Sequence, residues 1–163
     1  MNKTILYLFS VFFCLVSSAA FSQTPGQGIG RVLSQEDIAE LMYTVGPEGK
    51  ELPEGQGTAR EGEQIYTQNC IFCHGPEGLN GPQNTLKGGA RFPFATSIWD
   101  YIHRAMPRSI ANVGVQGRQL SVDETYALTA YLLYINGIVD QDTVLDTDLI
   151  MKIEMPMEKK PVN

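Results

Sequence analysis

The chain has 163 residues, which is enough for one domain with a hydrophobic core. Its formal net charge of −6 at pH 7 argues against a nucleic-acid-binding protein, because such proteins need a basic surface. It contains three cysteines and two histidines, so any site made of these residue types must use few side chains.

Residues 1–22 have the features of a secretory signal peptide. Lys3 precedes an apolar run over 5–16, and small residues suited to cleavage follow. The run is short for a membrane span, and an uncleaved anchor is the alternative interpretation. Cleavage would remove Cys14 and leave an exported chain with a charge of −7 and two cysteines. The signal therefore predicts a periplasmic protein that has no stable membrane span after cleavage.

Helix signals occur four times in the exported part of the chain. Two of them are capping boxes, in which a Thr or Ser is followed three residues later by Glu. Pro107 stops the third helix and Gly137 stops the last. The predicted helices are a short one that begins at Ser34, one from Thr58 towards Cys70, one over 97–106 and one over 123–136.

No segment shows the alternation of a half-buried strand, so the sequence predicts an all-α fold with long loops. A few helices joined by long loops cannot fill a core by themselves, and we expect a large apolar group in the middle. The expected boundaries are a signal peptide over 1–22, an N-terminal extension packed on the domain over 23–57, the helical domain over 58–137 and a C-terminal tail over 138–163, extended and with at most one turn.

The motif Cys70-Ile-Phe-Cys73-His74 has several interpretations. A thioredoxin-like dithiol needs a βαβ unit and an attacking thiol at a helix start, and neither is predicted here. A structural zinc site needs four protein ligands, and adjacent Cys73 and His74 cannot easily share one tetrahedral metal. A disulfide is compatible with export but leaves the core unfilled.

Cys-x-x-Cys-His is also the attachment signature of c-type haem, in which the two thiols bond the vinyl groups and the histidine binds the iron. A haem would supply the missing apolar bulk, and its attachment outside the cytoplasm agrees with the signal peptide. We therefore predict one covalent haem c held by Cys70, Cys73 and His74, with His74 as an iron ligand.

A second iron ligand on the opposite face is usual in electron carriers, and it is Met or His. Met106 ends a predicted helix and is followed by Pro107, so its thioether can reach over the haem while the proline stiffens the turn. Met155 has a similar setting in the tail, and it is an alternative, as is His103. We predict Met106, together with His74, as the metal ligands.

Taken together, these residues resemble a class I mono-haem cytochrome c. The resemblance implies a fold in which the first and last helices of the domain cross at a Gly/aromatic contact, with Gly62 or Tyr66 against Tyr131. It also implies a proline carbonyl, here that of Pro82, as the hydrogen-bond acceptor for the His74 ring. The residues that carry the resemblance are Gly62 and Tyr66, the motif Cys70–His74, Met106 and Tyr126–Leu132.

Most of the exported chain is similar to the cytochrome subunits of bacterial sulfite dehydrogenases and to the related cytochrome of the sulfur-oxidising Sox system. The resemblance implies a molybdenum-containing sulfite dehydrogenase subunit as electron donor, and a terminal oxidase or second cytochrome as acceptor. Arg91, Trp99 and Tyr101 are candidates for contacts with the haem carboxylates, with a purely structural role as the alternative for each. The similar segments are 28–31, 37–39, 52–57, 92–96, 99–102, 104–107, 123–133 and 136–138.

The expected function is outer-sphere electron transfer by an exported cytochrome that accepts single electrons from a dehydrogenase acting on sulfite or another sulfur compound. One alternative is a general periplasmic carrier to a terminal oxidase. Another is a haem enzyme with an open distal site, which would require that Met106 does not bind the iron. A subunit whose haem only stabilises a complex is the third. An electron-transfer subunit or carrier is favoured over a catalyst by itself.

Overall fold

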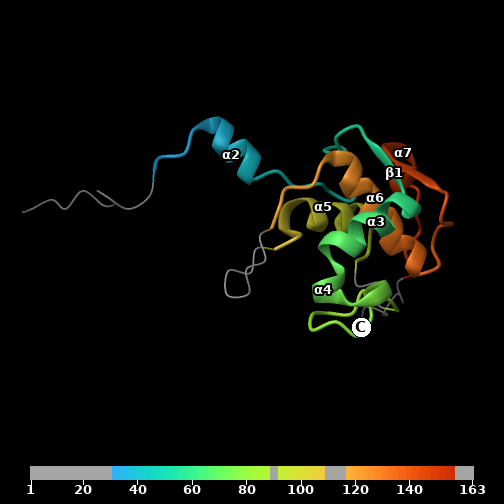
Figure 1. Cartoon of the computed structure of the whole chain (residues 1–163). Coiled ribbons are helices and arrows are strands. Elements are labelled where there is room, and N and C mark those ends of the chain that lie inside the picture. The colour runs from blue at the N-terminus through green and yellow to red at the C-terminus, as the bar shows by residue number, and fades with distance from the viewer. Residues whose placement is uncertain (1–30, 89–91, 109–116, 157–163) are drawn as a thin grey trace, which may run out of the picture. The chain divides into compact units, whose positions relative to one another are not determined.

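The structure, a computed structural model, describes residues 31–88, 92–108 and 117–156 (Figure 1). It divides into two units, residues 1–41 and 42–163. The predicted signal peptide and Arg91 lie outside the described residues.

The first unit contains the short helix α2, Gln35–Leu41. The Ser34 hydroxyl accepts a hydrogen bond from the Asp37 backbone N–H at 3.0 Å, and the Ser34 N–H donates to the Asp37 carboxylate at 2.8 Å. The helix start predicted at Ser34 is therefore confirmed.

The two long helices with capping boxes are α3, Ala59–Asn69, and α6, Val122–Ile135. Thr58 caps α3: its N–H donates to Glu61 at 2.8 Å, and its hydroxyl accepts from the Glu61 N–H at 3.3 Å. The same pair of bonds joins Ser121 and Glu124 at the start of α6. Both predicted capping boxes are confirmed, because the bonds that make them lie within three residues of the chain.

α3 and α6 pack directly against each other (Figure 1). Their closest approach is at Gly62. A Cβ at position 62 would collide with the Ala127 backbone and the Tyr131 side chain, so the contact requires glycine. Beside the crossing, the Tyr66 and Tyr131 rings lie 5.0 Å apart. The predicted Gly/aromatic contact is therefore present.

The third helix, α5, spans Ala95–Ala105 and packs against α6. It starts two residues before the predicted boundary at 97, because its N-cap Phe94 makes no side-chain hydrogen bond that a sequence pattern could reveal. Met106 is its C-cap, which places the predicted methionine ligand at the end of a rigid element.

Between α3 and α5 the chain forms two short turns and then a loop. The one-turn helix α4 is Ile71–His74, and the 3-10 turn η1 is Pro76–Gly78. Cys70 separates α3 from α4, so the helix predicted to run from Thr58 towards Cys70 ends at Asn69. The described residues after η1 contain no further regular element before α5, as expected for a Gly- and Pro-rich segment.

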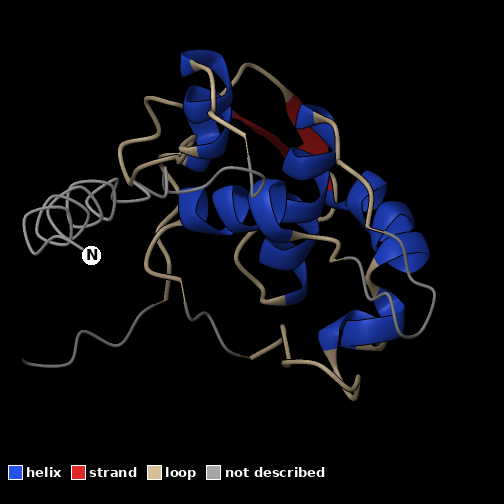
Figure 2. Cartoon of the chain, turned by 90° about the vertical axis from the view of Figure 1, so that its left-hand side faces the viewer, coloured by secondary structure: helices blue, strands red, loops and turns tan. Residues whose placement is uncertain are grey.

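The domain is mainly helical, but a small sheet corrects the expectation that it contains no strand. β1, Gln56–Thr58, pairs antiparallel with β2, Val144–Asp146, with Gly57 opposite Leu145. Figure 2 shows the two strands beside the helices, and both contact α6. Each strand has three residues, which is too short for an alternating pattern to be visible in the sequence.

The segment expected to be an extended C-terminal tail instead forms a strand and a short helix up to residue 150. After β2, Asp146 caps the short helix α7, Thr147–Ile150. Leu145 and Ile150 are completely or almost completely buried in the core. At the other end, Val45 and Leu52 of the predicted extension also join the core. Both flanks therefore contribute to the packing of the helical domain, while the predicted domain boundaries themselves stay a prediction.

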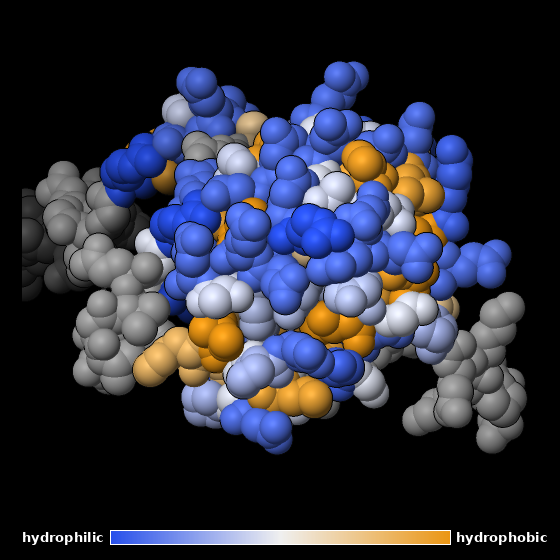
Figure 3. All heavy atoms as spheres, turned by 45° about the vertical axis from the view of Figure 1, so that its right-hand side comes forward, coloured by the Kyte–Doolittle hydropathy of each residue, from blue (hydrophilic) through white to orange (hydrophobic). Residues whose placement is uncertain are grey.

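The surface agrees with the charged composition. On the face seen in Figure 3, hydrophilic side chains predominate and apolar ones form separate patches. No helix among the described residues is long and apolar enough to cross a bilayer.

Candidate functional site

One cavity in the second unit is lined by all four predicted site residues, Cys70, Cys73, His74 and Met106. Its volume is about 640 Å³, which lies within the range of about 300–1,000 Å³ typical of cofactor pockets. Most of its lining surface is apolar, and its buried aliphatic side chains come from α5, α6 and the segment before α6. The buried apolar lining residues are Ile98, Ile102, Leu120, Leu128 and Leu133.

The single turn of α4 holds the cysteine motif together. The Cys70 carbonyl accepts hydrogen bonds from the N–H groups of Cys73, at 3.1 Å, and His74, at 2.9 Å. Both thiols are free, so the disulfide interpretation is not favoured. Burial raises the pKa of the Cys70 thiol to about 11, which keeps it protonated at neutral pH. Cys70 and Cys73 are therefore two reduced thiols on the wall of the same apolar cavity.

The His74 ring is oriented by a backbone carbonyl. Its Nδ1 lies 2.9 Å from the carbonyl oxygen of Asn84. A carbonyl only accepts hydrogen bonds, so Nδ1 carries the proton and the Nε2 lone pair is available to a metal. The predicted acceptor, the Pro82 carbonyl, is corrected to Asn84, two residues further along the chain. The loop can bring Asn84 there because Gly81 packs its backbone against that of His74, where a Cβ would lie 2.3 Å from the His74 carbonyl carbon.

Two further contacts fix the chain around the motif. The buried Tyr66 hydroxyl donates to the carbonyl of Gly75 at 2.7 Å and so ties α3 to the residue that follows His74. On the other side, the Asn136 amide donates to the Leu86 carbonyl at 3.0 Å and accepts from the Gly88 N–H at 2.8 Å. Sequence reasoning did not identify Asn136 as a site residue, because its partners lie about fifty positions away.

Met106 lines the cavity at the end of α5, and its N–H donates to the Ile102 carbonyl at 3.0 Å. Met155 also lines the cavity, so two methionine side chains share it. His103 does not line it. Its ring stacks on Trp99 at 4.7 Å and meets Tyr43 edge-on at 5.8 Å, and burial lowers its pKa. Of the candidate second ligands, the cavity therefore brings together Met106 and Met155 but not His103.

Of the residues predicted to contact the haem carboxylates, some line the cavity and others do not. Tyr101 lines the cavity, whereas Trp99 does not and packs instead against Tyr126 and His103. Trp99 is thus a fully buried core residue on another side of α5. The structure adds Arg108, which the sequence did not single out. Apart from His74, it is the one basic side chain among the described lining residues, none of which is acidic.

The cysteine edge of the cavity is close to solvent. Phe72 lies between the two cysteines and is 67% exposed. The motif residue between the two cysteines therefore faces solvent rather than the cavity, whose lining does not include it.

The donor set agrees with the expected haem. Two free thiols, an imidazole with an available Nε2 and a thioether surround an apolar space of cofactor size, and these are the groups that hold a c-type haem. Among the described residues, no group of three or more His, Cys, Asp and Glu side chains is arranged to hold a metal ion alone.

Comparisons with known proteins place this chain among proteins of related sequence and fold. Residues 57–132 match the family described as cytochrome c oxidase, cbb3-type, subunit III. Cytochrome c-551 of Bacillus subtilis (strain 168) is 47% identical over 36 residues, which are 21% of this chain and about a third, 32%, of that protein's length. A chain in the crystal structure of the sulfane dehydrogenase SoxCD from Paracoccus pantotrophus is 30% identical, with a TM-score of 0.62 over 82% of this chain and 72% of that one.

Proposed function

Because this chain belongs to the cytochrome c family, which implies haem c, we propose that it is an exported mono-haem electron carrier that accepts electrons from a dehydrogenase acting on sulfite or another sulfur compound. The observation that carries the proposal is the placement of Cys70, Cys73, His74 and Met106 around one apolar cavity of about 640 Å³.

Each of the four residues has a distinct task. The thiols of Cys70 and Cys73 would add to the two vinyl groups and so fix the cofactor by thioether bonds. His74 offers Nε2 to the iron, and its bond to the Asn84 carbonyl holds the ring in that orientation. Met106 offers its thioether from the end of α5. Haem iron carries one electron by cycling between the ferric and ferrous states, and a His/Met pair raises its reduction potential.

The rest of the cavity controls solvent and charge. The apolar side chains of α5 and α6 exclude water from most of the space, which disfavours an extra charge inside it. Arg108 and the Tyr101 hydroxyl are the groups that would pair with the cofactor's carboxylates. The exposed side chain of Phe72 leaves the cysteine edge open for docking of a redox partner.

The sulfur-related part of the proposal has two supports. One is the similarity to a chain of sulfane dehydrogenase SoxCD, which extends over most of both chains. The other is the sequence resemblance to the cytochrome subunits of sulfite dehydrogenases. Export to the periplasm is proposed from the signal-like residues 1–22 and from the haem motif, whose attachment occurs outside the cytoplasm.

A second candidate function is a carrier that exchanges electrons with an oxidase. It is favoured by the match of residues 57–132 to a subunit family of cbb3-type cytochrome c oxidase, and by the short match to cytochrome c-551. The two candidates differ in the electron donor and agree on the haem and its ligands.

The test is the visible spectrum of the native exported fraction before and after addition of sulfite, or of thiosulfate as a sulfane-sulfur compound. We expect reduction of the haem within seconds in the fraction, but not in the purified cytochrome alone, which controls for direct chemical reduction. A haem that only dithionite reduces would contradict the sulfur-related donor and favour the second candidate.

A further inference from the structure

We infer that Arg118 is a clamp that holds the wall of the haem cavity closed between the end of α3 and the start of α6, and so protects the Met106–iron bond from competing ligands. The inference rests on the proposed ligation of haem by Met106. Arg118 would act as a positioning residue, through the cavity wall and without contact with the iron.

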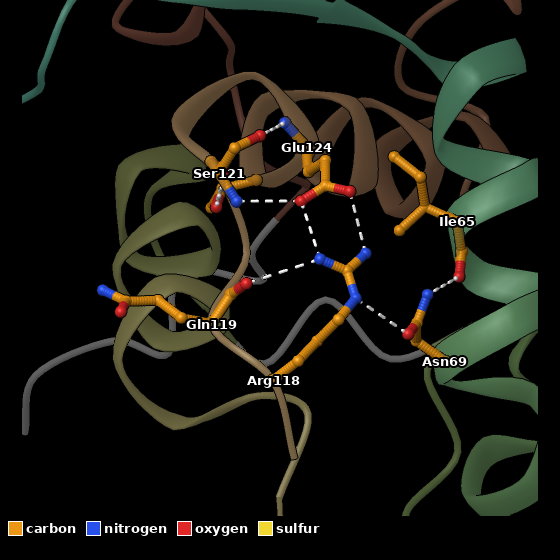
Figure 4. A network of polar contacts seen from close by, with 7 residues as sticks. Ile65, Asn69, Arg118, Gln119, Ser121 and Glu124 are labelled. Atoms are coloured by element: carbon orange, nitrogen blue, oxygen red, sulfur yellow. Dashed lines mark hydrogen bonds and ion pairs between the residues drawn. The ribbon is translucent and has the colours of Figure 1, made fainter. Parts of the chain in front are cut away.

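The contacts of Arg118 reach both helices (Figure 4). Its two terminal nitrogens donate to the two carboxylate oxygens of Glu124, each at 2.8 Å, in a forked pair. Its Nε donates to the side-chain oxygen of Asn69 at 3.1 Å. A planar guanidinium presents donors on both of its edges and can make these contacts at once, whereas an ammonium group lacks this forked geometry.

Both partners are themselves held in place. The Asn69 amide donates to the Ile65 carbonyl at 2.8 Å, which fixes the side chain on the last turn of α3. The Glu124 carboxylate also accepts from the Ser121 N–H at 2.8 Å, which is part of the capping box of α6. The guanidinium therefore links two side chains that are each fixed by another hydrogen bond. Such a link holds the end of α3 and the start of α6 at a fixed distance from each other.

The clamp lies directly at the cavity. Asn69 lines it and precedes Cys70, the first predicted attachment residue. Leu120, two residues after Arg118, also lines the cavity and is 3% exposed. Leu120 and Arg118 belong to the short described segment, residues 117–121, that leads directly into α6. Release of Arg118 would let this wall move away from α3 and would open a path into the cavity.

The experiment measures the affinity of imidazole for the ferric holoprotein. The readout is the loss of the spectrum of thioether-ligated haem as imidazole is added. We expect Arg118→Gln and Glu124→Gln each to raise the affinity about two- to fivefold, the factor that corresponds to the loss of one exposed ion pair. Gln at position 124 keeps the bond to the Ser121 N–H, because a capping box accepts Gln as well as Glu. Arg118→Lys keeps the charge without the fork and should lie between wild type and Arg118→Gln.

The control variant is Arg60→Gln, which breaks a comparable surface pair with Asp142, 2.7 Å long, away from the cavity. It should leave imidazole binding unchanged. The reduction potential distinguishes an electrostatic effect from an effect of the clamp on the cavity wall. Arg118→Gln should lower the potential and Glu124→Gln should raise it, because the two changes alter the local charge in opposite directions. Imidazole affinity should rise in both variants, since both open the clamp.

Equal imidazole affinities in wild type, Arg118→Gln and Glu124→Gln would overturn the clamp, as would shifts of opposite sign in the two variants, which would indicate a purely electrostatic effect. A rise of the same size in Arg60→Gln would overturn it too, because the effect would then be a general loss of stability. The ligand assignment is tested separately: if Met106→Ala binds imidazole as wild type does, the proposed function fails at Met106 and the clamp fails with it.

Discussion

Gly62 of α3 lies against the backbone of Ala127 of α6, so closely that a Cβ at position 62 would be 2.0 Å from the Ala127 carbonyl oxygen. This contact sets the distance between the two helices that form much of the domain core, and α6 also lines the cavity through Leu128, Leu132 and Leu133. The distance between α3 and α6 at this crossing therefore influences the shape of the cavity.

Substitution Gly62→Ala is expected to destabilise the protein by about 1–3 kcal/mol, because the methyl group must push α3 and α6 apart in a close-packed contact. Denaturant unfolding of the holoprotein measures the change. Gln64→Ala, an exposed change on the same helix, is the control and should be close to neutral. Equal unfolding midpoints for the two variants would show that the crossing tolerates a side chain.

The two methionines in the cavity are expected to behave differently. Met106→Ala should abolish the low-spin His/Met spectrum of the ferric haem, because it removes the thioether from the end of α5. Met155→Ala should keep that spectrum and change only packing, and the exposed Met42→Ala should change nothing. If Met155→Ala loses the His/Met spectrum and Met106→Ala keeps it, Met155 is the iron ligand and Met106 is a packing residue.

Covalent attachment is expected to depend on both cysteines. The double variant Cys70→Ala/Cys73→Ala should lose the haem that co-migrates with the chain on a denaturing gel, because no thioether bond can then form. Phe72→Ala changes the exposed residue between the two cysteines and should retain attached haem. Haem that remains bound in the double variant under denaturing conditions would contradict the attachment site.

Arg108 is expected to raise the reduction potential. Arg108→Gln removes a positive charge from the cavity lining, which stabilises the ferric state. The potential should fall by tens of millivolts, the effect of one unit charge over about 10 Å at an effective dielectric constant of about 20–40. A spectroelectrochemical titration measures the shift. Lys50→Gln, an exposed change outside the cavity lining, should leave the potential close to that of wild type. An unchanged potential in Arg108→Gln would mean that the guanidinium points away from the cofactor.

Acid should weaken the protein partly through Glu124. The hydrogen bonds from Arg118 and from the Ser121 N–H lower the pKa of Glu124 to about 2. Because the folded-state pKa lies below the ordinary value of about 4.3, the stabilisation is present above that value and is lost as pH falls towards 2. We expect a contribution of up to about 1 kcal/mol, the upper end for an exposed ion pair.

Unfolding free energies measured between pH 6 and about pH 2 should therefore fall less steeply for Glu124→Gln than for wild type. Glu48→Gln, which changes an exposed carboxylate in the loop before β1, is the control. Parallel pH profiles for wild type and Glu124→Gln would show that the ion pair contributes nothing to acid stability.

The sequence by itself determined the features whose physical causes are local. Capping boxes at Thr58 and Ser121, the stop at Gly137 and the grouping of Cys70, Cys73 and His74 on one turn all depend on bonds that span three or four residues. Such bonds leave a fixed spacing in the sequence, so a pattern can reveal them. The haem motif is of this kind, which is why the cofactor could be predicted before the fold.

Only the tertiary structure decided the features that join distant segments. The pairing of Gly57 with Leu145, the Asn84 carbonyl at the His74 ring, the entry of Met155 into the cavity and the link from Arg118 to Asn69 leave no spacing that a pattern could reveal. Of these contacts, the link made by Arg118 joins α3 to α6, the two helices that cross at Gly62. Residue types near the motif determine which cofactor binds, and the packing of distant segments determines how tightly its surroundings are held.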